Sequence, residues 1–258
     1  MTDRSTRRLR AEILIVLGLS LGESAVFALW RIVERYLASR PIGQQTATLH
    51  PSASSLDVMD FLNQLLRIGF KILPVALALY LLGAGAVRAR DRLGLVWTGR
   101  RASVFGDLAR GALLAAAIGI PGLALYRAGR MLGQSVKIDT GGLPDAWWAI
   151  VVLLLSAAAA ALLEETVAVG YLLTRLGDLQ WRIPAMVVAS ALLRGSYHLY
   201  QGWPMAVGNV AMGIVFALAY LKFKRLGPLI AAHFLLDLVS FVGPEVVPES
   251  WIDWLHVA

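Results

Sequence analysis

The chain has 258 residues, of which 58% are hydrophobic and 16% are charged, and it contains no cysteine. Soluble domains are usually about 45–50% apolar and about 25% charged, and the lack of cysteine excludes disulfides, thiolate metal sites and a cysteine nucleophile. The net charge of +7 does not indicate nucleic-acid binding. The basic residues flank apolar blocks, where they set membrane topology and contact anionic lipid headgroups.

Long apolar blocks predict an all-α, polytopic bundle of about seven transmembrane spans (range six to eight). We expect one integral membrane domain over residues 1–258. Each block is near the ~20 residues that cross ~30 Å of hydrocarbon. The predicted spans are residues 11–30, 68–87, 104–126, 145–174, 183–200, 204–221 and 226–242.

The first span follows the basic tail MTDRSTRRLR. It is too long for the apolar region of a signal peptide and has no small-residue cleavage site, so we expect it to be retained. Glu23 lies in this span beside Gly18 and Gly22, which form a GxxxG pattern. The pattern predicts helix packing, with Glu23 in a buried hydrogen bond and not in catalysis.

A polar loop over residues 38–64 leads from Ser55 into a predicted amphipathic helix. Its polar face carries Asp60, Gln64, Arg67 and Lys71, at spacings of four, three and four. We expect this helix to lie in the membrane interface before the second span. The alternative is that its polar stripe lines an entrance to a cavity.

Clusters of arginine and lysine indicate the orientation. With seven spans they fall on one side, so the positive-inside rule predicts a cytoplasmic N-terminus and a C-terminus outside. Arg127, Arg130 and Lys137 are on the other side. The Arg- and Ala-rich composition indicates a bacterial plasma membrane. The final stretch SWIDWLHVA is predicted to form a cap that lies in the membrane interface. The clusters are Arg4, Arg7, Arg8 and Arg10; Arg88, Arg90, Arg92, Arg100 and Arg101; Arg175 and Arg182; and Lys222, Lys224 and Arg225.

Ionisable side chains at membrane depth usually face the bundle interior and mark a functional site. The C-terminal half has most of them, so we expect a polar cavity there. Pairs four apart share a helix face, whereas the adjacent glutamates diverge by about 100°. Two histidines and a carboxylate from three helices form either an acid–base set or three metal ligands. The residues are Glu164, Glu165, Arg194, His198, His233 and Asp237, with Asn209 as a helix bridge or a supporting group.

Three stretches carry a family resemblance: EETVAVGYL in the fourth span, YHLYQG in the fifth and HFLLDL in the seventh. They resemble the motifs of the CAAX protease and bacteriocin-processing family of membrane proteins, which read approximately EExxxR, FxxxH and HxxxN/D. The resemblance covers Leu162 to about Val242. We take residues 145–242 as a CAAX-protease-like catalytic core.

The resemblance implies an intramembrane endopeptidase that cleaves a membrane-associated polypeptide without an essential metal or cofactor. Glu164 corresponds to the general base that activates water, and Glu165 to its structural or assisting neighbour. His198 and His233 would orient that water and stabilise the oxyanion. Asp237 would help to hold the oxyanion or position His233.

Two positions depart from the family pattern. Val169 stands where the motif has arginine, and Arg194 stands where it has phenylalanine. An arginine is thus lost from one helix and gained on a facing one, so we expect Arg194 to pair with Glu165. The alternative is an inactive relative that acts as a scaffold or regulator of another membrane protein. A metal-dependent enzyme would use Glu164, His198 and His233 as ligands, although there is no HExxH motif.

The predicted depths leave one conflict. Glu164 is nineteen residues, or ~28 Å, from Asp145, which puts it near the cytoplasmic face. His198 is ~22 Å from that same face if its helix begins at Ile183. Either the fifth span begins deeper or the fourth is strongly tilted.

Overall fold

The computed structural model describes residues 3–84, 87–96 and 103–256. Residues 85 and 86 of the predicted second span lie outside these ranges, as do the arginines at 100 and 101. The elements are α1 (Asp3–Gly18), α2 (Leu21–Leu37), η1 (Ile42–Gln44), β1 (Thr46–Thr48), α3 (Asp57–Gly83), α4 (Ala89–Arg92), α5 (Val104–Met131), β2 (Lys137–Asp139), α6 (Ala149–Glu164), η2 (Glu165–Tyr171), α7 (Leu172–Asp178), α8 (Ile183–Tyr197), η3 (Leu199–Gln201), α9 (Trp203–Phe223), α10 (Gly227–Val246) and α11 (Glu249–His256).

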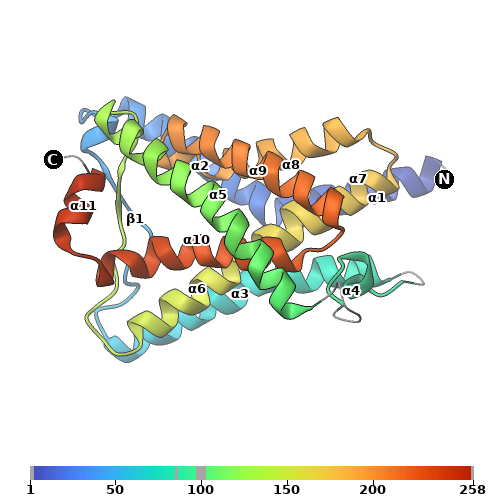
Figure 1. Cartoon of the computed structure of the whole chain (residues 1–258), viewed down its shortest axis with the longest axis horizontal. Helices are drawn as coiled ribbons and strands as arrows, with labels where there is room; N and C mark the ends of the chain where they lie inside the picture. The colour runs from blue at the N-terminus through green and yellow to red at the C-terminus, as the bar shows by residue number, and fades with distance from the viewer. Residues whose placement is uncertain (1–2, 85–86, 97–102, 257–258) are drawn as a thin grey trace.

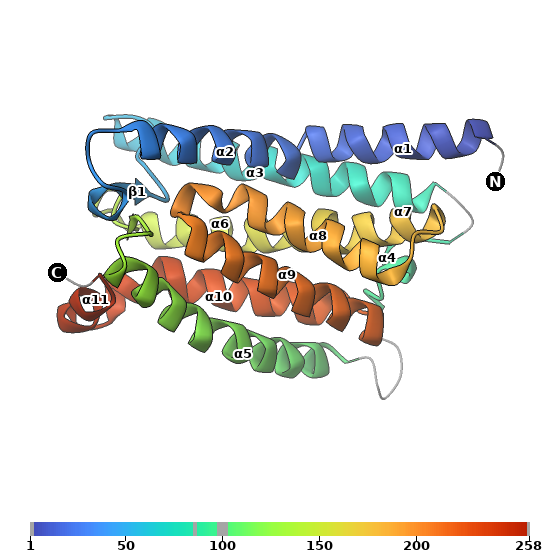
Figure 2. The same ribbon diagram turned by 90° about the horizontal axis from the view of Figure 1, so that it is seen from above.

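The long helices lie side by side along one direction (Figure 1). Helix α10 packs on α5 and α6, α8 packs on α9 and α2, and α3 packs on α6. Helix α1 begins at one end of the bundle and α11 lies at the other, as both views show (Figures 1 and 2). The core lies where α6, η2 and α7 are surrounded by the other helices, and many of its members are fully buried.

Five of the described helices are long and apolar enough to cross a membrane, and a bent pair makes six. The chain is therefore a multi-pass helical membrane protein, and its span count reaches the predicted range of six to eight only if the bent pair is counted as one span. The predicted span over 183–200 is α8, which has 15 residues and is ~22 Å long. A count of seven spans is not confirmed, because α8 is shorter than the hydrocarbon layer is thick.

The predicted first span is two helices that meet at a bend of 52°. Between them Ser20 leaves the helical conformation and bonds through Oγ to the carbonyl of Val16. A Cβ atom added to Gly18 would have no neighbouring atom within 4 Å. One added to Gly22 would lie only 2.6 Å from the carbonyl oxygen of Leu17. These glycines therefore form a bend and not the predicted packing face.

Helix α3 runs without a break from Asp57 to Gly83. The predicted interfacial helix is therefore wrong as a separate element, because it continues directly into the second span. Its polar stripe divides into two parts. Asp60 is buried and accepts hydrogen bonds from the backbone of Ala53 and from Gln64, which fixes the preceding loop, whereas Lys71 faces a cavity.

Helices α6 and α7 form one run of 30 residues, Ala149–Asp178, interrupted by the seven-residue π-helix η2. Glu164 lies at the middle of this run, ~21 Å from Asp178, and His198 lies ~22 Å from Ile183. The conflict in depth disappears because the fourth span ends four residues later than predicted. A short turn then joins α7 to α8, so both residues are equally far from the same end.

Small residues allow α8 and α9 to pack closely. A Cβ on Gly195 would lie 2.3 Å from Val210 Cγ2, and one on Gly213 would lie 2.7 Å from Ala191 Cα. This contact holds the last turn of α8, which carries the polar motif, against the core.

A short parallel pair of strands, β1 and β2, is the exception to the all-α prediction. Thr46 pairs with Lys137 and Thr48 with Asp139. The pair joins the loop after α2 to the loop after α5 at the end of the bundle where α11 lies (Figure 1). In α11, Trp251 and Trp254 are exposed, and its place in the membrane interface stays a prediction.

Candidate active site

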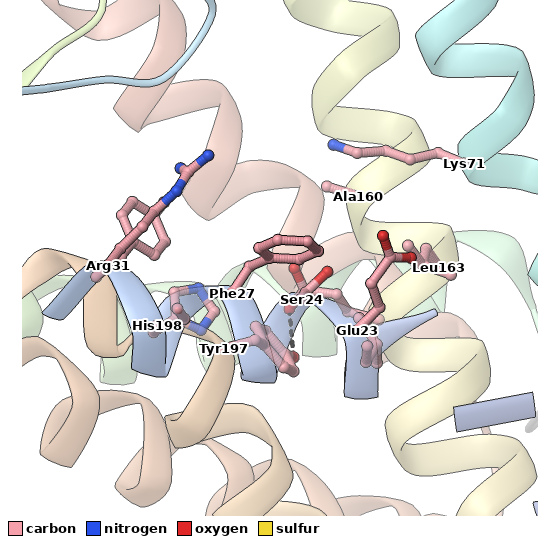
Figure 3. Close-up of a pocket in the computed structure, with 13 residues that line it drawn as sticks. Glu23, Ser24, Phe27, Arg31, Lys71, Ala160, Leu163, Tyr197 and His198 are labelled. Carbon is pink, nitrogen blue, oxygen red and sulfur yellow. Dashed lines mark hydrogen bonds between the residues drawn. The ribbon is translucent and has the colours of Figure 1, made fainter. Parts of the chain in front are cut away.

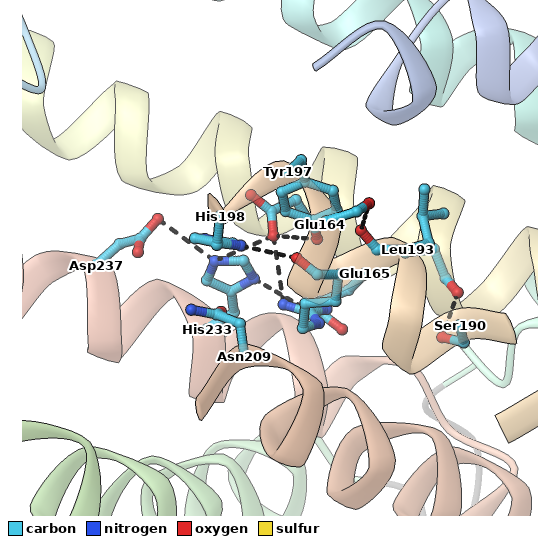
Figure 4. Close-up of polar contacts among 12 residues, drawn as sticks. Glu164, Glu165, Ser190, Leu193, Tyr197, His198, Asn209, His233 and Asp237 are labelled. Carbon is cyan, nitrogen blue, oxygen red and sulfur yellow. Dashed lines mark hydrogen bonds and ion pairs between the residues drawn. The ribbon is translucent and has the colours of Figure 1, made fainter. Parts of the chain in front are cut away.

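The polar residues of the three motifs converge at the centre of the helix bundle (Figure 4). Glu164 ends α6, and Glu165 begins η2. Arg194 and His198 come from the last turn and the end of α8, and His233 comes from α10. The structure thus brings together the glutamates, the histidines and the arginine that the sequence singled out.

A π-helix begins directly after Glu164. Such segments are rare and often occur at functional sites. The wider turn changes the backbone pairing, and the carbonyl of Ala168 accepts a 2.7 Å hydrogen bond from Ser190 Oγ on α8. The helix carrying the two glutamates is therefore tied by hydrogen bonding to the helix carrying Arg194.

Arg194 lies between the two glutamates. Its Nη2 is 2.5 Å from Glu165 Oε1, and its Nη1 is 3.3 Å from Glu164 Oε2. The predicted contact of Arg194 with Glu165 is present, and a contact with Glu164 accompanies it. The guanidinium also lies 5.3 Å from the ring centroid of Phe216. Arg194 and Glu165 have 1% and 0% of their side chains exposed, so they form a buried ion pair whose members depend on each other.

His233 completes this buried layer. Its Nδ1 is 2.7 Å from Glu165 Oε1, and because a carboxylate only accepts hydrogen bonds, Nδ1 carries the proton. The other nitrogen, Nε2, lies 3.9 Å from Glu164 Oε2 and 3.5 Å from Asp237 Oδ2. His233 therefore connects Glu165, at the back of the site, with the two other carboxylates.

Glu164 belongs to an outer layer that reaches a cavity. It keeps 14% of its side chain exposed, and its Oε2 accepts a 2.6 Å hydrogen bond from the hydroxyl of Tyr197. His198 Nδ1 lies 3.0 Å from the carbonyl of Arg194, so Nδ1 is the donor. Nε2 of a neutral His198 is then an acceptor beside Glu164 on the cavity wall.

Asn209 lies on α9 at the edge of this arrangement. Its amide donates to the carbonyl of Met205 on its own helix, and its role as a helix bridge or a supporting group stays a prediction. Figure 4 places it near His233.

A cavity of about 430 Å³ adjoins the site (Figure 3). Its volume is in the range of small-molecule pockets. The cavity is not enclosed by the C-terminal spans alone, as the sequence predicted, because α2 and α3 supply part of its wall. The lining residues are Leu21, Glu23, Ser24, Phe27, Ala28, Arg31, Lys71, Ala160, Leu163, Glu164, Tyr197, His198 and Tyr200.

The predicted role of Glu23 is corrected by this cavity. Its side chain is exposed on the cavity wall and not buried between packed helices. Among the residues that the structure describes, no group of three or more His, Asp or Glu side chains is arranged to hold a metal ion.

Tyr197 is a residue whose place at the site the sequence did not predict, and Lys71 was placed at a cavity only by the alternative interpretation of its polar stripe. Tyr197 directly precedes His198 in the YHLYQG stretch, so its position in the motif was the available signal. Lys71 was expected on an interfacial helix or, alternatively, at the polar entrance of a cavity. Its depth within the apolar part of α3 was the signal that favours the second interpretation.

Comparison with known families agrees with this geometry. Residues 146–239 match the family model described as type II CAAX prenyl endopeptidase Rce1-like. The match confirms the resemblance to the CAAX proteases. The Rce1-like segment contains every residue of the two polar layers, from Glu164 to Asp237, and begins after α5. No curated protein and no solved structure matches the chain.

Proposed function

We propose that the protein is an intramembrane endopeptidase that hydrolyses a peptide bond of a membrane-associated polypeptide. One observation carries the proposal. Glu164 reaches the cavity wall within the Rce1-like segment, with one carboxylate oxygen held by Tyr197 and Arg194 and with His198 beside it.

In the proposed reaction Glu164 removes a proton from a water molecule, and the hydroxide forms a bond to the carbonyl carbon of the substrate. The carbonyl π electrons move onto oxygen and give a tetrahedral oxyanion. When the C–N bond breaks, Glu164 returns the proton to the leaving nitrogen. The products are a carboxylic acid and an amine, and no covalent enzyme intermediate forms.

The histidines have separate roles in this scheme. His198 Nε2 accepts a hydrogen bond from the attacking water and orients it, because Nδ1 already donates to the Arg194 carbonyl. A protonated His233 presents Nε2–H toward the oxyanion, while its Nδ1–H donates to Glu165. Asp237, 3.5 Å from Nε2, positions this imidazole.

The ion pair of Arg194 and Glu165 is proposed as the structural support of the site. Arg194 replaces the arginine that the motif would have at Val169, from the facing helix. Because it also contacts Glu164, it fixes the orientation of both carboxylates through a pair of charge-assisted hydrogen bonds.

We further propose a bacterial plasma membrane as the location, with the N-terminus cytoplasmic and the C-terminus outside. The start of α1, α4, the end of α7 and the end of α9 lie at one end of the bundle (Figure 2). These elements carry or adjoin the basic clusters, so the positive-inside rule supports this orientation.

The test compares purified wild type with Glu164→Gln, each with and without a chelator, against a library of membrane peptides read by mass spectrometry. Asp145→Asn, an exposed loop carboxylate, is the matched control. Cleavage by wild type and control alone, unchanged by chelator, supports the proposal. Loss with chelator favours a metalloenzyme. Folded protein that cleaves nothing favours the alternative function as a scaffold or regulator of another membrane protein.

A further inference from the structure

Lys71 lies near the middle of an apolar helix. It is fourteen residues from Asp57 and twelve from Gly83, or ~21 Å and ~18 Å along α3. A lysine at this depth is unfavourable unless it faces water or an opposite charge, and such residues usually mark a functional site. Lys71 lines the same cavity as Glu164, and Figure 3 shows Lys71 on one wall of that cavity.

A second cation lines this cavity from the facing helix. Arg31 on α2 and Lys71 on α3 lie on different walls, with Phe27 between them in the view of Figure 3. Within the described parts of the chain, neither forms a hydrogen bond or an ion pair with another residue. Glu164, a motif carboxylate on the same wall, is already bound by Arg194 and Tyr197. Glu23 also lines the cavity, but among the described residues it forms no ion pair with either cation. The cavity therefore presents two positive groups that have no direct ion-pair partner there and can pair with an acidic occupant.

The spacing along α2 fits an extended polypeptide. Glu23, Phe27 and Arg31 follow one another at intervals of four residues and all line the cavity, so they rise by ~6 Å per step. Alternate side chains of an extended chain are ~6.6–6.8 Å apart. A peptide lying along α2 can thus place one side chain at Arg31 and the next on the same side at Phe27.

We propose that Arg31 and Lys71 form a subsite for an acidic side chain of the polypeptide that occupies the cavity. This inference rests on the proposed function and specifies its substrate class. The favoured peptide has an aspartate or glutamate that contacts Arg31 and Lys71, and a large apolar residue two positions away that contacts Phe27. An acidic residue at the end of the peptide near Glu23 is disfavoured, because the two carboxylates repel each other. Both cations lie outside the segment that matches the family model.

The test measures peptide binding separately from cleavage. One apolar peptide sequence is made with aspartate, asparagine or lysine at a single position, and the position is moved along the peptide. Binding to full-length Glu164→Gln in detergent is measured by fluorescence anisotropy. At one position we expect the aspartate peptide to bind about tenfold more tightly than the asparagine peptide, as for close charge pairs across an interface.

Variants of the two cations decide the assignment. Adding Lys71→Gln or Arg31→Gln should reduce the aspartate preference about tenfold, Lys71→Arg should retain it, and Lys71→Glu with Arg31→Glu should favour the lysine peptide. Lys222→Gln, at the end of α9, is the matched control. Melting temperatures show whether each variant is folded, and a misfolded Lys71 variant leaves Arg31→Gln to decide. An unchanged preference in folded variants overturns the proposal.

The same peptides distinguish the two proposals. Acid-selective binding that depends on Lys71, without cleavage by wild type, contradicts the protease and keeps the subsite. Cleavage without any preference for acid keeps the protease and overturns the subsite. Lysine- and arginine-dependent binding of phosphatidylglycerol, with no acid-selective binding of peptide, would instead identify the occupant as a lipid phosphate and overturn the proposal.

Discussion

The hydroxyl of Tyr197 donates a 2.6 Å hydrogen bond to Oε2 of Glu164. Arg194 approaches the same oxygen to 3.3 Å. The carboxylate therefore has two donors fixing one oxygen, from residues that are three apart on α8. This geometry makes Tyr197 a positioning residue for the proposed base.

Tyr197→Phe should lower kcat by about 10–100-fold with little change in KM. A hydrogen bond to a charged group contributes about 1.5–3 kcal/mol, and here its loss would release the base without removing substrate contacts. The measurement is steady-state cleavage of a peptide found in the library. Tyr200→Phe is the control, because that ring also lines the cavity while its hydroxyl accepts from Gln201. Equal losses in both variants would count against a specific role for Tyr197.

Arg194→Leu should destabilise the protein by about 3–5 kcal/mol, because it leaves buried carboxylates without their cation. Replacing Glu165 by leucine in the same chain should recover a large part of this loss, since no buried charge then stays at that position. Unfolding in mixed micelles gives both values. Fully additive single effects would show that the two residues do not interact energetically.

The sequence predicted the parts of the site that are carried by side-chain type and spacing. A charged residue inside an apolar block is visible without a structure, and the exchange of arginine between Val169 and Arg194 led directly to the contact with Glu165. The family motifs placed the histidines on the correct helices. These features depend on local sequence and on the high cost of unpaired charge in a membrane.

Backbone geometry could not be predicted in the same way. The π-helix has no distinct sequence signal. The one extra residue in its wider turn shifts the register of the backbone carbonyls, and so determines that Ser190 contacts the carbonyl of Ala168. The glycines near Ser20 fit both a packing face and a bend, and only the surrounding helices distinguish them. Periodicity likewise does not show whether the polar stripe containing Lys71 lies along the interface or inside a span.

Ser190→Ala should destabilise the protein by about 1–3 kcal/mol, because the buried carbonyl of Ala168 in η2 loses its donor. We expect cleavage to fall as well, since this hydrogen bond ties the helix of the glutamates to α8. Ser240→Ala removes an exposed bond within α10 and should change stability little. Thermal unfolding and peptide cleavage are measured for both, and similar effects would contradict a special role for the bond to η2.

His50 should make stability depend on pH. Burial and the nearby Lys71 lower the pKa of His50 to about 4, below its usual ~6.5 in the unfolded chain. The unfolded state then binds the proton more strongly than the folded state. The contribution of neutral His50 to folding stability is therefore fully present above about pH 6.5 and is lost as the pH falls toward about 4.

His50→Phe should flatten the decline between pH 6.5 and 4, since the ring of His50 packs at 4.5 Å on Phe241 and phenylalanine keeps an aromatic contact. Melting temperature against pH is the measurement. Parallel curves for wild type and variant would assign the decline to other groups.

The position of Lys71 also bears on how the protein is made. A lysine at the centre of a transmembrane helix raises the free energy of that helix's insertion by the translocon by about 2.5–3.5 kcal/mol. When α3 leaves the ribosome, the helices α6 and α8 that enclose the polar cavity have not been synthesised. We therefore expect α3 to settle at its final depth late in biogenesis, after the C-terminal core has entered the bilayer.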